Sequence, residues 1–165
     1  MARMDTARLV LRPPEPHDFD AFFELHEDPE VLRHIPSSAR GNRVAAWRTF
    51  AQVLGHWQIR GYGQWTVIEK ASGEVIGRVG LWFPDGAPAI ELGWIIRRSR
   101  WNNGFATEAA QAAGRYGLET VGARRLVSII QPDNLASIRV AEKIGERLER
   151  TDVQNGATVL VYALS

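Results

Sequence analysis

The chain has 165 residues, 45% of them hydrophobic, with a formal net charge of +1 and no cysteine. This length and composition predict a single domain over residues 1–165 with an ample core, and the near-neutral charge gives no broad positive field for nucleic acid. The absence of cysteine excludes disulfides, thiolate metal sites and cysteine nucleophiles. We expect a cytoplasmic protein without a membrane partner, because no signal-peptide pattern or roughly 20-residue apolar run is present.

The first part of the chain predicts one strand and two helices. Residues 9–12 form a short β-type run that two prolines end. Aromatic and leucine residues recur at helical spacing over residues 18–26, and a longer amphipathic pattern covers residues 44–59. The polar, glycine-containing stretch of residues 33–43 is predicted to be mostly loop.

Three strands are predicted in the middle of the chain. Residues 64–69 and 74–83 are joined by Ser72-Gly73, which is typical of a hairpin turn. A second turn, Pro84-Asp-Gly, leads into a third strand over residues 89–97.

The last part alternates helices with strands. We expect helices over residues 105–120 and 135–144, and strands over residues 125–131, 147–153 and 158–164. The complete order predicts an α+β (mixed α/β) domain, with a mostly antiparallel twisted sheet of six to seven strands and about four helices.

A basic cluster and a glycine turn come directly before the third predicted helix. Arg97, Arg98 and Arg100 precede Asn102-Asn103-Gly104. A helix start offers unpaired N–H groups and the positive end of the helix dipole, and glycine lets a ligand approach the backbone, so this stretch suits a phosphate. The alternative is that Asn103 caps the helix and the arginines are merely solvated. Neither the P-loop motif nor the dinucleotide-binding glycine motif is present.

The preceding strand points to an extended ligand. Its residues Ile90, Leu92, Trp94 and Ile96 share one face, and Gly93 predicts a β-bulge or a close backbone approach. Backbone groups freed at such an opening can pair with an extended molecule that carries amides. Coenzyme A is extended, bears amides and ends in a pyrophosphate.

Four segments together resemble the GNAT N-acetyltransferases, in particular the RimJ/RimL-type branch. They are TARLVLRP at residues 6–13 with Asp18, DPEV at 28–31, WNNGFATEA at 101–109 and NLASIRVAEKIG at 134–145. In family order they cover essentially the whole chain. Two positions depart from the broad family pattern: Trp101 replaces glutamine or arginine at the start of the pyrophosphate loop, and Glu146 replaces the phenylalanine that usually follows the last glycine.

The resemblance implies a GNAT-like fold and acetyl-CoA as cosubstrate, with no metal. Acetyl transfer to a primary amine would proceed by direct attack on the thioester. The backbone amides of residues 102–107 would hold the pyrophosphate. The cofactor-binding residues that the resemblance implies are Trp94, Ile95, Ile96, Arg97, Trp101, Asn102, Asn103, Gly104, Phe105, Ala106, Thr107, Asn134 and Ser137.

Two residues are the catalytic candidates. By analogy to the family's strand carboxylate, Glu91 would be the general base for the amine. Ser137 would protonate or hydrogen-bond the CoA sulfur, while Asn134 holds a pantetheine amide. Backbone N–H groups of residues 93–95 could polarise the thioester carbonyl. The structural alternatives are an exposed strand carboxylate, or a cross-strand partner of an arginine, at Glu91 and a simple helix start at Asn134 and Ser137.

Other functions stay open at this point. The same fold can serve as a non-catalytic acyl-CoA-binding or sensing domain. A nucleotide-binding protein of another fold is disfavoured because its motifs are missing, and a serine hydrolase because Gly-x-Ser-x-Gly is missing. Relatives in the branch acetylate ribosomal protein N-termini, aminoglycosides, amino acids or polyamines, and homodimers are common in the family.

Several polar residues have a functional and a structural interpretation. Asp28, Glu30 and Asp85 could attract a cationic amine, although acidic loop residues are often only solvated. His26 and His34 flank acidic residues, but their spacing fits no standard metal site, so we expect structural or surface roles for the histidines.

Overall fold

The computed structural model describes residues 2–35 and 41–165, so the loop expected over residues 33–43 lies partly outside the described residues. The described strands form one eight-stranded sheet in the order β1-β2-β3-β4-β5-β6-β8-β7. The strands are β1 (Met4–Asp5), β2 (Leu9–Arg12), β3 (Gln64–Glu69), β4 (Val75–Trp82), β5 (Ile90–Ile96), β6 (Leu126–Ile130), β7 (Arg147–Gln154) and β8 (Ala157–Leu164).

Four α-helices accompany the sheet in the described part of the chain, and each of their bounds differs from the predicted one by at most one residue. They are α1 (Phe19–Glu27), α2 (Arg43–Arg60), α3 (Phe105–Glu119) and α4 (Leu135–Lys143). The mixed α/β class and the mostly antiparallel sheet are therefore confirmed. The one strand that the sequence did not predict is β1, since two residues are too few to show a periodic pattern. Over the described residues, no helix has the length and apolarity needed to cross a membrane.

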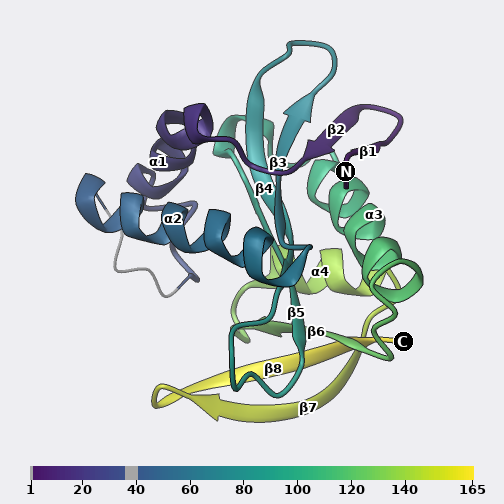
Figure 1. Cartoon of the computed structure of the whole chain (residues 1–165). Helices are drawn as coiled ribbons and strands as arrows, with labels where there is room; N and C mark the ends of the chain where they lie inside the picture. The colour runs from purple at the N-terminus through teal and green to yellow at the C-terminus, as the bar shows by residue number, and fades with distance from the viewer. Residues whose placement is uncertain (1, 36–40) are drawn as a thin grey trace.

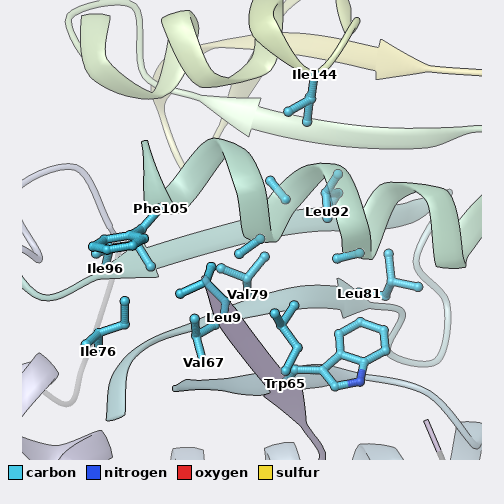
Figure 2. Close-up of a cluster of buried hydrophobic side chains, with 14 of the residues drawn as sticks. Leu9, Trp65, Val67, Ile76, Val79, Leu81, Leu92, Ile96, Phe105 and Ile144 are labelled. Atoms are coloured by element: carbon cyan, nitrogen blue, oxygen red, sulfur yellow. The ribbon is translucent and has the colours of Figure 1, made fainter. Parts of the chain in front are cut away.

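The helices lie on both faces of the sheet (Figure 1). α1 and α2 cover one face, and α3 covers the other with α4 beside it. The main core fills the space between α3 and the central strands, as Figure 2 shows for Val79, Leu81, Leu92 and Phe105. Small residues on α3 allow the close approach: a Cβ added at Gly117 would lie 2.8 Å from a methyl carbon of Leu126.

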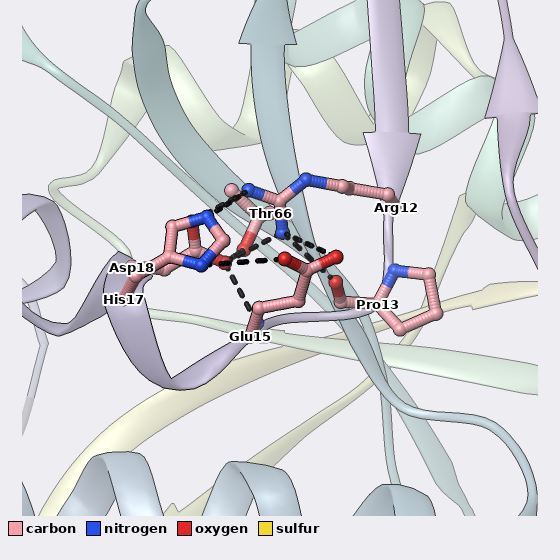
Figure 3. A network of polar contacts seen from close by, with 6 residues as sticks. All are labelled: Arg12, Pro13, Glu15, His17, Asp18 and Thr66. Atoms are coloured by element: carbon pink, nitrogen blue, oxygen red, sulfur yellow. Dashed lines mark hydrogen bonds and ion pairs between the residues drawn. The ribbon is translucent and has the colours of Figure 1, made fainter.

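An ion pair holds the start of α1 against the sheet, on the face opposite to α3 (Figure 3). The guanidinium of Arg12 donates to both carboxylate oxygens of Asp18 at 2.7 and 2.6 Å, and Thr66 Oγ1 donates to the same carboxylate at 3.0 Å. Burial by itself would raise the pKa of Asp18, but these hydrogen bonds hold that pKa below its ordinary value. Because Arg12 and Thr66 belong to β2 and β3, the network anchors α1 over the sheet.

The central strands part from one another between β5 and β6. β5 pairs with β4 from Glu91 to Ile96, but it meets the parallel strand β6 at only two residue pairs, Ile90–Leu126 and Glu91–Val127. The β-bulge predicted at Gly93 is wrong, because Gly93 lies in regular register opposite Gly80. Gly93 instead lies just beyond the point where β5 leaves β6, and a Cβ there would meet no atom within 4 Å.

A serine and a glutamate hold β5 and β6 together at the point where the two strands separate, which we call the fork. Ser128 Oγ of β6 lies 2.8 Å from the carbonyl oxygen of Leu92 and 2.7 Å from Glu146 Oε1. The hydroxyl has one hydrogen, so it cannot donate to both oxygens at once. A protonated Glu146 resolves this conflict, because it donates to Ser128, which then donates to Leu92.

The surroundings of Glu146 favour that protonated form. This side chain is only 3% exposed, and its Oε2 has no hydrogen-bond partner among the described residues. Burial raises the pKa of Glu146 to about 7, and the hydrogen bond with Ser128 opposes the shift. The carboxyl therefore changes its charge near neutral pH.

We expect Glu146→Gln to alter the pH dependence of stability. Because the folded-state pKa lies above the ordinary value of 4.5, the wild type loses stability as pH rises from about 4.5 through 7. The variant cannot ionise at this position, so its free energy of unfolding should rise relative to that of the wild type over that range. The complete change should be on the order of 3 kcal/mol. Urea unfolding at pH 5, 6, 7 and 8 measures this difference. A difference that stays constant with pH would contradict the assignment.

Candidate active site

A cavity of about 700 Å³ opens where β5 and β6 separate. Its walls come from β5, from the loop before α3 and the first turn of α3, and from the end of β6 with the start of α4. All of the residues predicted to bind the cofactor or to act in catalysis line this cavity, except Arg97 and Asn103.

The edge of β5 presents backbone groups to the cavity. The carbonyl of Leu92 points toward β6, where Ser128 donates to it. Because backbone groups alternate sides along a strand, those of Trp94 and Ile96 point the same way. The carbonyl of Ile96 accepts a 2.7 Å hydrogen bond from Trp101 Nε1. The N–H and C=O of Trp94 and the N–H of Ile96 are thus placed to pair with an extended ligand.

The start of α3 has the unpaired amides that the sequence predicted. Gly104 is the N-cap residue, with φ of 79° in the left-handed region, and no side chain caps this helix. The first helical bond runs from Glu108 N to Gly104 O, which leaves the N–H groups of residues 105–107 for a ligand. By contrast, α4 is capped by Asn134, whose Oδ1 accepts from Ser137 N at 3.1 Å.

Contacts from the β1–β2 turn hold this helix start in place. Thr6 Oγ1 and Arg8 N donate to Glu108 Oε1 at 2.6 and 2.8 Å, and Arg8 Nε donates to Glu108 Oε2 at 2.7 Å. The Arg8 guanidinium lies 4.5 Å from the ring centroid of Phe105 and also donates to the carbonyl of Asn103. The candidate phosphate site is therefore held in place by contacts from the β1–β2 turn.

The side chain of Asn103 braces the loop itself. It donates to the carbonyl oxygens of Arg100 and Trp101 at 3.2 and 2.8 Å.

The three arginines before the loop are engaged with carboxylates. Arg97 pairs with Glu24 at 2.6 Å, Arg98 with Asp28 at 3.1 Å, and Arg100 with both Glu69 and Glu74. Of the three, only Arg100 lines the cavity.

Two other cations, Arg139 and Lys143, were not predicted from the sequence as part of the site. Both belong to α4 and line the cavity, and neither has a hydrogen-bond or ion-pair partner among the described residues. Their four-residue spacing puts them on one helix face, which is the signal that could have found them.

Ser137 has a hydroxyl hydrogen available for the cavity. Trp94 Nε1 donates to Ser137 Oγ at 3.3 Å, which occupies an acceptor position of the hydroxyl. The hydroxyl hydrogen has no acceptor among the described residues. Ser137 also lies in the first turn of α4 beside its cap, so the structural and the functional interpretation hold together.

Glu91 lies on the other face of β5, away from Leu92 and Trp94, and lines the cavity with Arg78 of β4. Burial raises the pKa of Glu91 above its ordinary value, and the charge of Arg78 opposes this. Burial lowers the pKa of Arg78 to about 10, so this side chain keeps its charge at neutral pH. Arg78 was not predicted from the sequence; the pattern that could have indicated it is a single charge within the strand sequence VIGRVGLW.

The other polar residues lie apart from this arrangement or are already paired. Asp28 pairs with Arg98, Glu30 with Arg33, and Asp85 is not part of the cavity wall. His26 is buried, with Nδ1 2.8 Å from the carbonyl of Phe22, and burial lowers its pKa to about 4. Within residues 2–35 and 41–165, no group of three or more potential metal ligands comes together.

Comparison with known proteins agrees with this geometry. The family model for the acetyltransferase (GNAT) domain matches residues 8–147. The uncharacterized protein YkkB of Bacillus subtilis is 31% identical over 97% of this chain and 94% of its own length. The crystal structure of an acetyltransferase from Agrobacterium tumefaciens is 30% identical, with a TM-score of 0.86 over 100% of this chain and 95% of that one.

A further solved structure shows the same fold at lower identity. It is RimL, a ribosomal L7/L12 α-N-protein acetyltransferase in complex with coenzyme A, with 22% identity and a TM-score of 0.80 over 96% of this chain and 94% of that chain. The family model, the 30–31% identical relatives and the shared fold lead to one conclusion. The chain belongs to the GNAT family of acetyltransferases and is an acyltransferase.

Proposed function

We propose that the protein is an acetyl-CoA-dependent N-acetyltransferase that acts on a primary amine. The observation that carries this proposal is that the free edge of β5 and the uncapped start of α3 face one cavity. The first suits the amides of the pantetheine arm, and the second suits the pyrophosphate. The complex of RimL with coenzyme A, a protein of the same fold, supports the choice of ligand.

The groups that line the cavity can be assigned to parts of acetyl-CoA from their positions and contacts. The C=O of Trp94 and the N–H of Ile96 would pair with pantetheine, and the amides of residues 102–107 would hold the pyrophosphate. Arg139 and Lys143, which line the cavity and have no partner among the described residues, would add charge-assisted contacts to phosphate. Arg97 and Asn103 would act indirectly, by holding the loop through the contacts described above.

The chemistry follows from three positions around the thioester. Glu91 would take a proton from the amine, directly or through water, so that the neutral nitrogen can attack the carbonyl carbon. The N–H of Trp94 would stabilise the oxyanion that forms. When the carbon–sulfur bond breaks, Ser137 would hydrogen-bond the leaving thiolate with the hydrogen that Trp94 leaves free. The nitrogen then loses its second proton to the thiolate, so the products are the acetylated amine, coenzyme A as the thiol and the proton that Glu91 took up.

The phosphate site can be tested at Gly104. We expect Gly104→Glu to weaken acetyl-CoA binding by at least about tenfold relative to Gly104→Gln, because only glutamate adds a negative charge at the helix start. The two variants share the strain of a side chain at φ of 79°, so their difference isolates the charge. Isothermal titration measures the affinity, and circular dichroism checks the fold. Failure of the wild type to bind acetyl-CoA would overturn the proposal.

The role of Glu91 can be tested through the pH dependence of kcat/KM. The base must be ionised, and burial raises its pKa, so its protonation should reduce the wild-type rate at a pH above the ordinary 4.5. Glu91→Gln should lower kcat by about 10²–10⁴-fold and lose this acid limb.

The acceptor amine titrates equally in both enzymes, so the comparison at Glu91 isolates the carboxylate. Glu30→Gln is the matched control, because Glu30 also lines the cavity but is exposed and paired with Arg33. An unchanged rate in Glu91→Gln would contradict the assignment.

A further inference from the structure

Arg78 and Glu91 are opposite charges that face one another without pairing. Cross-strand register puts Arg78 opposite Ile95, Gly80 opposite Gly93 and Trp82 opposite Glu91, so both charged residues lie on the same face of the sheet. Their positions differ by four residues, about 13 Å along the strands. No ion pair within 4.0 Å joins them in the described structure, although each influences the pKa of the other.

The space beside Gly93, which lies between the two charged residues, is open. Gly80 and Gly93 pair with each other between the two charged residues, and neither carries a side chain. A Cβ at Gly93 would meet no atom within 4 Å. Arg78, Gly93 and Glu91 all line the cavity, so a small molecule that enters it reaches both charges.

Arg78 has unused capacity to bind an anion. Among the described residues, its only hydrogen-bond partner is Gln64 Oε1, and its Nε–H is buried without a partner. Glu91 has no hydrogen-bond or ion-pair partner in the same set of residues. A half-buried guanidinium with one neutral hydrogen-bond partner and a half-buried carboxylate with none leave their charges partly uncompensated, and a ligand of matching charges would offset that cost.

The neighbouring charges do not take up this capacity. Asp18, on the same face, is satisfied by Arg12, and Glu30 pairs with Arg33. His26 feels the charge of Arg78 but is neutral, because burial lowers its pKa to about 4. Arg139 and Lys143 belong to α4, on the other side of the fork. The guanidinium of Arg78 also lies 5.4 Å from the ring centroid of Phe22, but as far as the described residues extend it has no carboxylate partner.

We infer that the acceptor is a primary amine that also carries a carboxylate, as a free amino acid does. This inference rests on the proposed function. The carboxylate of the acceptor binds the guanidinium of Arg78, and the amine lies between Glu91 and the thioester near Gly93. A charge-assisted contact with the planar guanidinium fixes the orientation of the amine for attack.

The same arrangement selects against other amines. A polyamine or an aminoglycoside brings only positive charge to Arg78, which repels it. An amino acid amide has the same shape as its parent but lacks the anion. Arg78 thus determines acceptor specificity by attraction of one class and repulsion of the others.

The test compares acetylation of a panel of L-amino acids with that of their amides, using acetyl-CoA and the wild type, Arg78→Met and Arg33→Met. Methionine keeps much of the volume of Arg78 without its charge. Arg33→Met is the matched control, because Arg33 lines the same cavity but pairs with Glu30. Arg78→Lys, which keeps the charge but not the planar fork, provides a second reading if Arg78→Met folds poorly.

We expect the wild type to prefer at least one amino acid over its amide by about 10–100-fold in kcat/KM. Arg78→Met should reduce that preference to about threefold or less, Arg78→Lys should give an intermediate value, and Arg33→Met should keep it. Equal or better use of amides by the wild type would overturn the inference, as would a preference that survives in Arg78→Met and Arg78→Lys.

Titration of acetyl-CoA separates this inference from the proposed function. Binding of acetyl-CoA with acetylation of amides or polyamines only would overturn the assignment of the acceptor and leave the acetyltransferase intact. No binding of acetyl-CoA by the wild type would overturn both.

Discussion

The two-residue contact between β5 and β6 is the constraint on which the rest of the molecule depends. A parallel pair that continued for the full length of both strands would satisfy the edge of β5 and close the sheet. Pairing ends instead at Glu91 and Val127, while β5 stays bound to β4 and β6 to β8. The sheet is thus continuous at one end of the fork and open at the other. The cavity, the free backbone groups and the position of α4 all follow from this separation.

The fork needs a stable closing point, and an unusual pair of side chains supplies it. Ser128 holds β6 to the carbonyl of Leu92, and Glu146 holds Ser128. A phenylalanine at position 146 would fill the same space with apolar atoms. The glutamate replaces that packing with a hydrogen-bonded chain that is complete only when its carboxyl is protonated. The departure from the family pattern therefore concerns the support of the fork and lies behind the cavity wall, not in it.

Charge is divided between the two sides of the fork. On the α4 side, Arg139 and Lys143 lie free beside the uncapped start of α3, where an anion of high charge would bind. On the other side, Arg78 and Glu91 line the cavity where Gly93 leaves open space between them. The remaining arginines near the cavity are tied to carboxylates and hold loops in position. The basic cluster at residues 97–100 therefore has a structural role. The cations without a carboxylate partner among the described residues of the cavity wall are Arg78, Arg139 and Lys143.

Hydrophobic periodicity and turn residues in the sequence by themselves determined the order of the elements, because each local pattern agrees with the element that formed. The glycine turn and the bare helix start at residues 102–107 were also readable, since unpaired amides at a helix N-terminus are a local property. Strand pairing could not be predicted from the sequence. The place where β5 leaves β6, and hence the cavity, depends on contacts between residues more than 30 positions apart. The same holds for charge, because only tertiary contacts decided that Arg97, Arg98 and Arg100 would meet carboxylates and that Arg78 would not.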